Sequence, residues 1–284
     1  MIASAPGKII LFGEHAVVYK RHALVSAISL RCYVEVERSN DFKITSPLGK
    51  TGLDFKVHPY VSYAVKRFCE YKNISGAEIR IRSEIPISSG LGSSSAVTVA
   101  TLKALSEEFE AGLSNEEIFE IAKAVELDVQ GKASGTDPFV STFGGSWLIP
   151  ERRKAEIPYS LFIVVLGEKS TAEMVKKVAE LRERHSDIIE KIFDAIDSIT
   201  IKAYRNLNDL KILEELISIN QSLLRAIGVS TPEIDKKIAE FEEKGFRVKI
   251  TGAGGGGCIF GIAKDNAPGI IVKCNEEGVR IEDS

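Results

Sequence analysis

The chain has 284 residues, with 37 Lys and Arg against 40 Asp and Glu, so its formal net charge is −3. Apolar residues make up 44% and charged residues 27%, which is an ordinary globular composition and excludes a disordered chain. Balanced charge argues against a nucleic-acid partner, because proteins that bind nucleic acid carry a basic surface. We therefore expect one large domain or two modest ones, and no nucleic acid.

Long apolar segments and paired cysteines are both missing from the sequence. Charged residues interrupt every apolar run well before the roughly 20 residues that a membrane span requires. Lys8, Glu14 and His15 fall where a signal peptide would need an apolar region. The four cysteines form no C-x-x-C pair. We expect a cytoplasmic protein with reduced thiols and no membrane partner.

The first third of the chain is rich in predicted strands. Short β-type runs cover residues 9–12, 16–19, 30–38 and 78–82. Apolar and polar side chains alternate from Cys32 to Glu37, which is typical of an antiparallel strand with one buried face. Helical spacing predicts a helix over residues 60–72 and another over 93–110.

A third helix is predicted to begin at the capping box of Ser114 and Glu117. After residue 160 the pattern changes, with a buried-type strand over 161–166 and long amphipathic helices behind it. A second capping box, Ser170 with Glu173, predicts the start of one of these helices.

The last quarter returns to strands. Thr231 and Pro232 predict the start of a final helix. Strands are predicted at 246–250, 258–262 and 270–273. Strands, then helices, then strands again predict two α+β domains, which we place at residues 1–155 and 156–284, with the boundary inside 150–158.

The segment from Pro86 to Ala96 (PISSGLGSSSA) follows a predicted strand and opens a predicted helix. Gly90 and Gly92 let the backbone turn and approach a ligand closely. The free amides of the first helical turn, together with the helix dipole, favour an anion such as phosphate. A plain glycine–serine turn with serine caps is the alternative, but the density of donors favours phosphate. The spacing is not that of a Walker A loop.

A second glycine-rich segment runs from Lys249 to Cys258 (KITGAGGGGC). It contains G-x-G-x-x-G, but the residues behind it are strand-like, so we reject a dinucleotide-binding fold. The segment is either a flexible hairpin or a place where the backbone approaches a ligand or the first glycine loop. We favour the close approach.

Five charged or polar residues carry little information when each is taken alone. Glu126 lies near the end of the third helix, and Asp137 lies in a turn of small residues behind it. Lys8 adjoins an apolar strand, and Glu14 and His15 follow Gly13 directly. A lone acid on a helix is usually solvated, and an Asp before Pro usually forms a turn.

Together, these segments resemble the GHMP family of small-molecule kinases, in the family's order from Ala5 to Ile262. PISSGLGSSSA is similar to the family's ATP-binding motif, and residues 251–258 are similar to its third, glycine-rich motif. Within the family, residues 8–19 (KIILFGEHAVVY) and 134–145 are most similar to the members that phosphorylate mevalonate. Pro138 departs from the Asn that many of these members carry after the aspartate.

The resemblance implies a fold and an ATP site. The expected fold is α+β, with an N-terminal domain like ribosomal protein S5, a ferredoxin-like C-terminal domain and an active site between them. The residues implied for ATP binding are Pro86, Ile87, Ser88, Ser89, Gly90, Leu91, Gly92, Ser93, Ser94, Ser95, Gly254 and Gly255.

The resemblance also implies the roles of individual side chains. Ser94 and Glu126 would hold Mg²⁺, a hard cation that takes few protein oxygens. Asp137 would accept or orient the proton of the substrate hydroxyl, and Lys8 would pair with Asp137 and stabilise the transferring group.

Substrate contacts are implied as well. Glu14 and His15 would contact the hydroxyls or the carboxylate of mevalonate. The implied reaction is ATP- and Mg²⁺-dependent phosphorylation of mevalonate to 5-phosphomevalonate in isoprenoid biosynthesis, and the resemblance is compatible with a homodimer. Two alternatives stay open: a kinase for another small alcohol such as phosphomevalonate, and a non-catalytic nucleotide-binding sensor.

Overall fold

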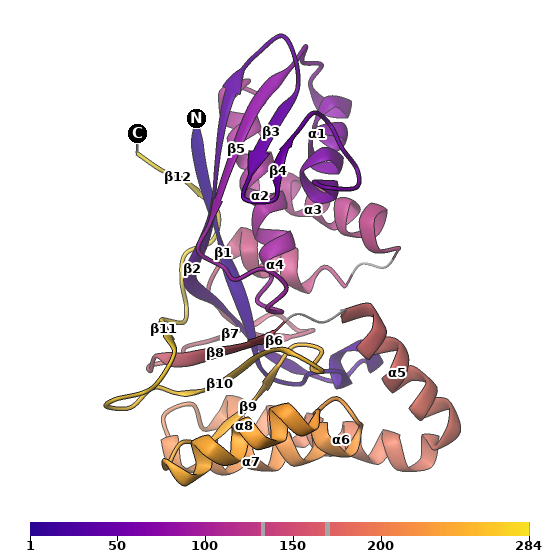
Figure 1. The fold of residues 1–284 in the computed structure, drawn as a ribbon, viewed down its shortest axis with the longest axis vertical. Helices are drawn as coiled ribbons and strands as arrows, with labels where there is room; N and C mark the ends of the chain where they lie inside the picture. Colours follow the sequence, from indigo (N-terminus) through magenta and orange to yellow (C-terminus); the bar gives the residue numbers. More distant parts are fainter. Residues whose placement is uncertain (132–133, 168–170, 284) are drawn as a thin grey trace.

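Two β-sheets organise the chain into an upper and a lower part (Figure 1). The computed structural model describes residues 1–131, 134–167 and 171–283. Strands and helices are mixed in both parts, which confirms the predicted α+β class. The second predicted capping box cannot be assessed, because Ser170 lies outside the described residues.

The upper sheet has eight strands, ordered β12-β1-β2-β5-β3-β4 with β6 and β7 branching from β2. Its strands are β1 (Ile2–Phe12), β2 (Ala23–Arg38), β3 (Lys43–Ser46), β4 (Gly49–Thr51), β5 (Ala77–Ser83), β6 (Ser146–Ile149), β7 (Arg153–Ala155) and β12 (Arg280–Ile281). The pairing of β3 with β5 is parallel and the other pairings are antiparallel. In β2, Cys32, Val34 and Val36 are fully buried, as the alternation predicts.

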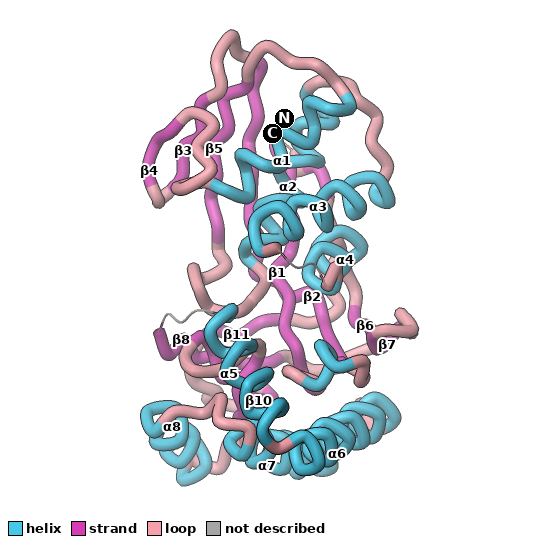
Figure 2. Tube along the Cα trace, turned by 90° about the vertical axis from the view of Figure 1, so that its right-hand side faces the viewer, coloured by secondary structure: helices cyan, strands magenta, loops and turns pink. Residues whose placement is uncertain are grey.

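Four helices cover one face of this sheet (Figures 1 and 2). They are α1 (Pro59–Tyr71), α2 (Ser93–Glu108), α3 (Asn115–Gln130) and α4 (Thr136–Phe143). The predicted capping box at the start of α3 is present, since Ser114 accepts from the Glu117 amide and Glu117 accepts from the Ser114 amide. Ten residues of α2 are buried, which makes it the central helix of the upper core.

The lower sheet is antiparallel, with the strand order β11-β8-β10-β9. Its strands are β8 (Leu161–Gly167), β9 (Val248–Thr251), β10 (Gly257–Ile262) and β11 (Ile270–Val272). The helices of this part are α5 (Thr171–Arg184), α6 (Ser186–Arg205), α7 (Leu210–Ala226) and α8 (Pro232–Glu243). Thr231 caps α8 as predicted, because its hydroxyl accepts from the Ile234 amide.

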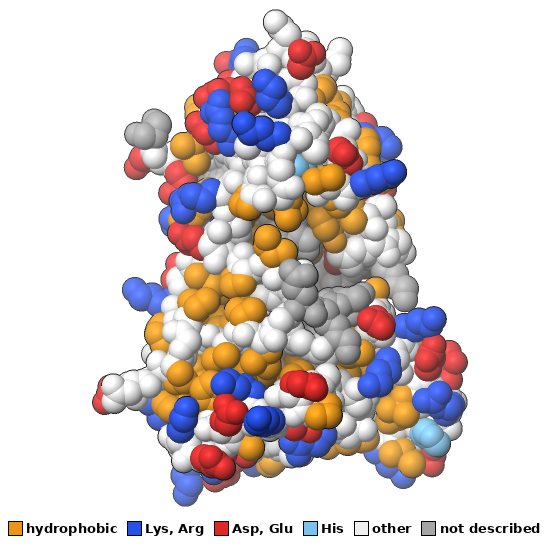
Figure 3. Space-filling model, in the orientation of Figure 1, with side chains coloured by type: hydrophobic (Ala, Val, Ile, Leu, Met, Phe, Trp, Pro, Cys, Tyr) orange, Lys and Arg blue, Asp and Glu red, His pale blue; other side chains and the backbone are white. Residues whose placement is uncertain are grey.

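One edge of the lower sheet exposes apolar side chains. Val165 of β8 and Ile270 and Ile271 of β11 are 41%, 38% and 50% exposed. Figure 3 shows hydrophobic side chains gathered over this region of the molecule. Among the described residues, no helix is both long enough and apolar enough to cross a membrane.

Two crossings of the chain between the two parts lie side by side. The first crossing runs between Ala155 and Leu161, and the second leads from β11 back to β12, which pairs with β1. The Asn275 side chain joins them, because it accepts from the Ile157 amide at 3.1 Å and donates to the Ile157 carbonyl at 2.8 Å. The division at 155/156 stays a prediction, and the C-terminal strand β12 belongs to the upper sheet.

Two of the predicted strands were wrong or incomplete. Residues Ala16–Tyr19 form a short 3-10 helix, η1, instead of a strand, because the backbone of Gly13 and His15 turns at positive φ (99° and 60°) just before it. The strand predicted at 30–38 begins earlier, at Ala23. The prediction missed its first part because small residues such as Ser26 and Ala27 have weak β-propensity, although they are buried in this strand.

Candidate active site

The predicted ATP loop leads into an uncapped helix N-terminus. Gly92 is the N-cap of α2 with φ 76°, and no side chain caps the helix. The first intrahelical bond runs from the Ala96 amide to the Gly92 carbonyl at 3.0 Å. The amides of Ser93, Ser94 and Ser95 therefore have no partner within the helix, and this arrangement suits an anion.

Lys8 and Asp137 form the charged centre beside that helix end. The Lys8 Nζ lies 3.3 Å from Asp137 Oδ2, and the side chains are 5% and 30% exposed. The Lys8 amide donates to the Leu91 carbonyl at 2.8 Å, which fixes the strand to the ATP loop. A Cβ on Gly92 would lie 2.8 Å from Lys8 Cγ, so only glycine leaves room for the lysine stem.

Asp137 is positioned by the junction of α3 and α4. It is the second residue of α4, which follows Gly135 at φ 70°. Glu126, in the last turns of α3, accepts from the Gly135 amide at 3.2 Å and so holds this junction. Burial, helped by the negative charge of Asp137, raises the pKa of Glu126 to about 7. The sequence prediction of a turn at Asp137 was wrong, because the residue lies inside a helix.

The second glycine-rich segment packs against the ATP loop, as predicted. It connects β9 to β10, so a strand follows it and the rejection of a dinucleotide-binding helix is confirmed. Cβ atoms on Gly252 and Gly257 would lie 3.6 Å from the Gly90 carbonyl and 3.1 Å from the Ser89 carbonyl. The Gly255 amide donates to the Val229 carbonyl at 2.7 Å. If Gly255 contributes to ATP binding, it therefore does so through shape and not through its N–H.

Glu14 and His15 lie at the meeting point of both parts of the molecule and are almost fully buried. The His15 Nε2 lies 2.9 Å from the Ala253 carbonyl, and burial lowers the pKa of His15 despite this bond. Glu14 forms an ion pair with Lys249 in which both side chains are 0% exposed. In this arrangement Glu14 offers no surface to a substrate, so its predicted direct contact would require it to move.

The structure thus brings several predicted residues together and adds one. Lys8, Asp137 and Glu126 meet at the start of α2, which packs against α3 and α4. Ser94 is half-buried in the first turn of α2. Lys249 was not assigned a role from the sequence. A lysine inside an apolar strand, next to a glycine loop, was the signal that could have singled it out.

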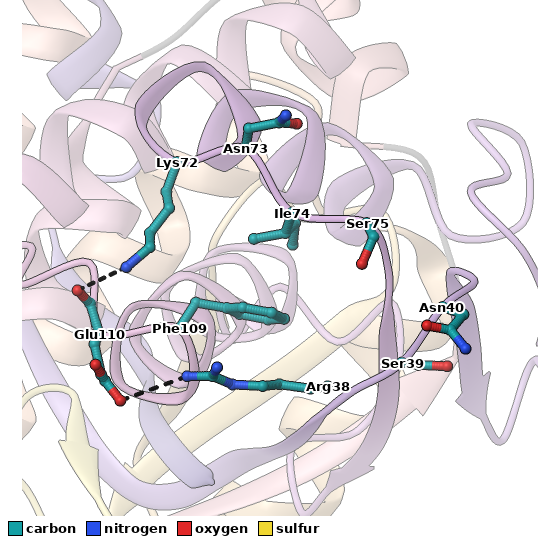
Figure 4. A pocket seen from close by; sticks show the side chains of 9 residues that line it. All are labelled: Arg38, Ser39, Asn40, Lys72, Asn73, Ile74, Ser75, Phe109 and Glu110. Atoms are coloured by element: carbon teal, nitrogen blue, oxygen red, sulfur yellow. Dashed lines mark hydrogen bonds and ion pairs between the residues drawn. The ribbon is translucent and has the colours of Figure 1, made fainter.

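A separate hollow of about 610 Å³ opens at the far end of the upper sheet (Figure 4). Its lining includes Arg38, Lys72 and Glu110, and none of the predicted site residues. The charged groups satisfy one another, since Arg38 lies 3.5 Å from the Glu110 carboxylate and Lys72 donates to the Glu110 carbonyl at 3.0 Å. This hollow is therefore not part of the candidate active site.

Known proteins share both the sequence and the fold. Residues 59–145 match the family described as GHMP kinases N terminal domain, and residues 200–280 match GHMP kinases C terminal. A mevalonate kinase of Archaeoglobus fulgidus is 65% identical over 285 residues, covering 100% of both chains.

Two solved structures support the same relationship. The mevalonate kinase of Methanococcus jannaschii superposes with a TM-score of 0.83 at 30% identity, covering 100% of this chain and 98% of that one. The L. major mevalonate kinase in complex with R-mevalonate gives a TM-score of 0.78 at 27% identity, covering 93% and 87%.

Proposed function

Because the chain belongs to the GHMP kinase family, we propose that it transfers the γ-phosphoryl group of ATP to the primary hydroxyl of mevalonate, forming 5-phosphomevalonate in isoprenoid biosynthesis. One observation carries the chemistry: the Lys8–Asp137 ion pair lies beside an uncapped helix N-terminus. Support for the acceptor comes from the similarity to mevalonate kinases, including one 65% identical over its full length.

Each residue has a physical task in this proposal. The phosphates of ATP bind along residues 86–95, where free amides and the dipole of α2 stabilise negative charge. Asp137 accepts or orients the hydroxyl proton of mevalonate, and its partial exposure leaves it accessible. Lys8 stabilises the charge that spreads over the transferring group.

The oxygen donors near Asp137 fit Mg²⁺. Glu126 and Asp137 lie close enough for their charges to interact, and a hydroxyl from Ser94 would complete a set of hard oxygen donors. No group of three or more His, Cys, Asp or Glu suited to a metal occurs within residues 1–131, 134–167 and 171–283. That finding is compatible with an ion held by one or two carboxylates and the phosphates of ATP. When bound, Mg²⁺ would neutralise phosphate charge, and Glu126 and Ser94 would hold it.

Glu126→Gln is expected to weaken the use of Mg²⁺. The amide keeps an oxygen for the Gly135 amide but loses the negative charge that attracts the cation. We expect the Mg²⁺ concentration for half-maximal activity to rise about tenfold, equivalent to about 1.4 kcal/mol, in a titration at saturating ATP. Glu120→Gln, at an exposed position of the same helix, is the matched control. An unchanged Mg²⁺ requirement would remove Glu126 from the metal site.

The acceptor is tested by ADP release in the presence of mevalonate, phosphomevalonate, homoserine, galactose or shikimate. We expect mevalonate to give the highest kcat/KM. Faster turnover of another acceptor would overturn the substrate assignment. ATP binding without turnover of any acceptor would instead favour the nucleotide-binding sensor.

Assembly and location are part of the same proposal. We propose a homodimer, supported by the exposed apolar edge formed by Val165, Ile270 and Ile271. Light scattering of the purified chain should give twice the mass of 31.0 kDa. The four cysteines carry free thiols, as expected in a reducing compartment, and this supports a cytoplasmic location.

A further inference from the structure

Lys249 is a fully buried cation in an edge strand of the lower sheet. It lies in β9, and its side chain has no exposed surface. Its Nζ donates to the Leu11 carbonyl at 3.0 Å, to the Ile250 carbonyl at 2.8 Å and to the Glu14 carboxylate. All three ammonium protons are therefore used, and two of the acceptors belong to the upper part of the molecule.

Glu14 depends on this lysine. Its Oε2 is buried and has no hydrogen-bond partner among the described residues, so Lys249 is the group that compensates its charge. The rings of Phe12 and Phe260 lie 5.6 Å and 5.1 Å from the Lys249 Nζ and close the site to water. Burial raises the pKa of Glu14, whereas Lys249, and more weakly Lys8, favour the ionised form.

The turn that contains Glu14 is tied to the second glycine loop. His15 binds the Ala253 carbonyl in the second loop. In β1, just before the turn, the Ile10 amide donates to the Thr251 hydroxyl at 3.1 Å, and this hydroxyl donates to the Ile10 carbonyl at 3.0 Å. Residues 8–15 therefore connect Lys8, and through it Asp137, to the anchor at Lys249.

Stability alone is a weak reason for such a pair. Removing two charges from water costs much of the free energy that their attraction gains. A protein with apolar residues of similar volume in their place is often as stable or more stable. The Glu14–Lys249 ion pair lies within a few residues of Lys8, so a role in the active site is a stronger reason for it.

We propose that Lys249 is a positioning residue for the reaction: through Glu14 and the Leu11 carbonyl it holds the 13–15 turn against the second glycine loop, and it neutralises Glu14 so that this carboxylate does not compete for Lys8. This inference rests on the proposed function. In the absence of Lys249, an ionised Glu14 would attract Lys8. The positive charge of Lys8 would then stabilise Asp137 and the transferring phosphoryl group less.

The test compares Lys249→Met with the double variant Lys249→Met/Glu14→Gln. The single variant leaves a buried carboxylate without its cation and should lower Tm strongly, whereas the double variant contains no buried charge and should recover Tm. In both variants the 13–15 turn has lost its anchor at Lys249. We therefore expect kcat/KM for mevalonate to stay at least about tenfold below that of the parent chain, even in the double variant. A tenfold loss of kcat/KM is equivalent to about 1.4 kcal/mol.

The pH profile separates positioning from simple support of the fold. Glu14 is faced by Lys249 from β9 and by Lys8 from β1. In Lys249→Met, Glu14 is neutral at low pH and ionises as the pH rises, so its competition for Lys8 should grow. The ratio of kcat in the double variant to kcat in the single variant should therefore increase between pH 6 and pH 9.

Controls and contrary outcomes are clear. Lys264→Met/Glu214→Gln removes a partly exposed ion pair of the same part and should leave kcat and KM unchanged. A stable double variant with the kcat/KM of the parent would overturn the inference, and so would a ratio that does not change with pH. If the single variant does not fold, the kcat/KM of the double variant alone tests the positioning role of Lys249. Failure of the proposed function would instead appear as an inactive parent chain.

Discussion

Replacing Asp137 with asparagine is expected to lower kcat by about 10²–10⁴-fold, the range that general acid–base assistance contributes. The amide has nearly the same shape but cannot accept the hydroxyl proton, and it loses the ion pair with Lys8 at 3.3 Å. Steady-state kinetics at saturating ATP and mevalonate would measure the effect. Because Asp137 is 30% exposed, we expect only a modest loss of Tm, which comes from the lost charge at the N-terminus of α4 and from Lys8 left without its ion pair.

The matched control for this substitution is Asp187→Asn. Asp187 is an exposed acid in the first turn of α6, so it loses the same charge in a comparable helix position. Its kcat should equal that of the parent chain. Should Asp137→Asn retain near-parental kcat with an intact fold, Asp137 has no role in proton transfer or in orienting the hydroxyl.

Gly92→Ala is expected to reduce kcat about 10²-fold, the scale of a misplacement of about 1 Å in an active site. The new methyl group would lie 2.8 Å from Lys8 Cγ, closer than van der Waals contact permits. Lys8 must shift, and with it the charge that faces Asp137. The left-handed backbone at φ 76° adds about 1–2 kcal/mol of destabilisation for any residue with a Cβ.

Gly112→Ala separates the cost of the left-handed backbone from the effect of the displaced Lys8. Gly112 has φ 67°, and a Cβ there would meet no atom within 4 Å. Both variants should lose the stability that the left-handed backbone costs, but only Gly92→Ala should lose kcat. Equal kcat in the two variants would mean that Lys8 tolerates the methyl group and that its exact place is not critical.

Local patterns predicted much of the fold correctly. The alternation in β2 and the capping box at Ser114 depend on neighbouring residues only, and both are present. The prediction of a strand at Ala16–Tyr19 was wrong because Val17, Val18 and Tyr19 belong to residue types that favour strands. Its conformation is decided by the turn before it, and the burial of Ala16 in the lower core depends on residues far away in the chain.

The candidate site was predictable as motifs but not as contacts. Both glycine loops were recognised, and their close approach was anticipated because runs of glycine permit it. The pairing of Lys8 with Asp137 was expected from the family resemblance alone. Glu14 and Lys249 are 235 residues apart, and no local pattern connects a lysine in one strand with an acid behind another. Long-range ion pairs of this kind require the three-dimensional structure.

The side-by-side crossings between the two parts limit how the molecule can open. Asn275 fastens the crossings together at Ile157, while Thr251 and Lys249 fasten the parts again at Ile10 and Leu11. A third set of links joins Arg21 and His22 to Glu190, Asp194 and Asp197 of α6, so several separate contacts hold the two parts together. The relative positions of Lys8 and the second glycine loop therefore depend on contacts that lie outside the candidate active site.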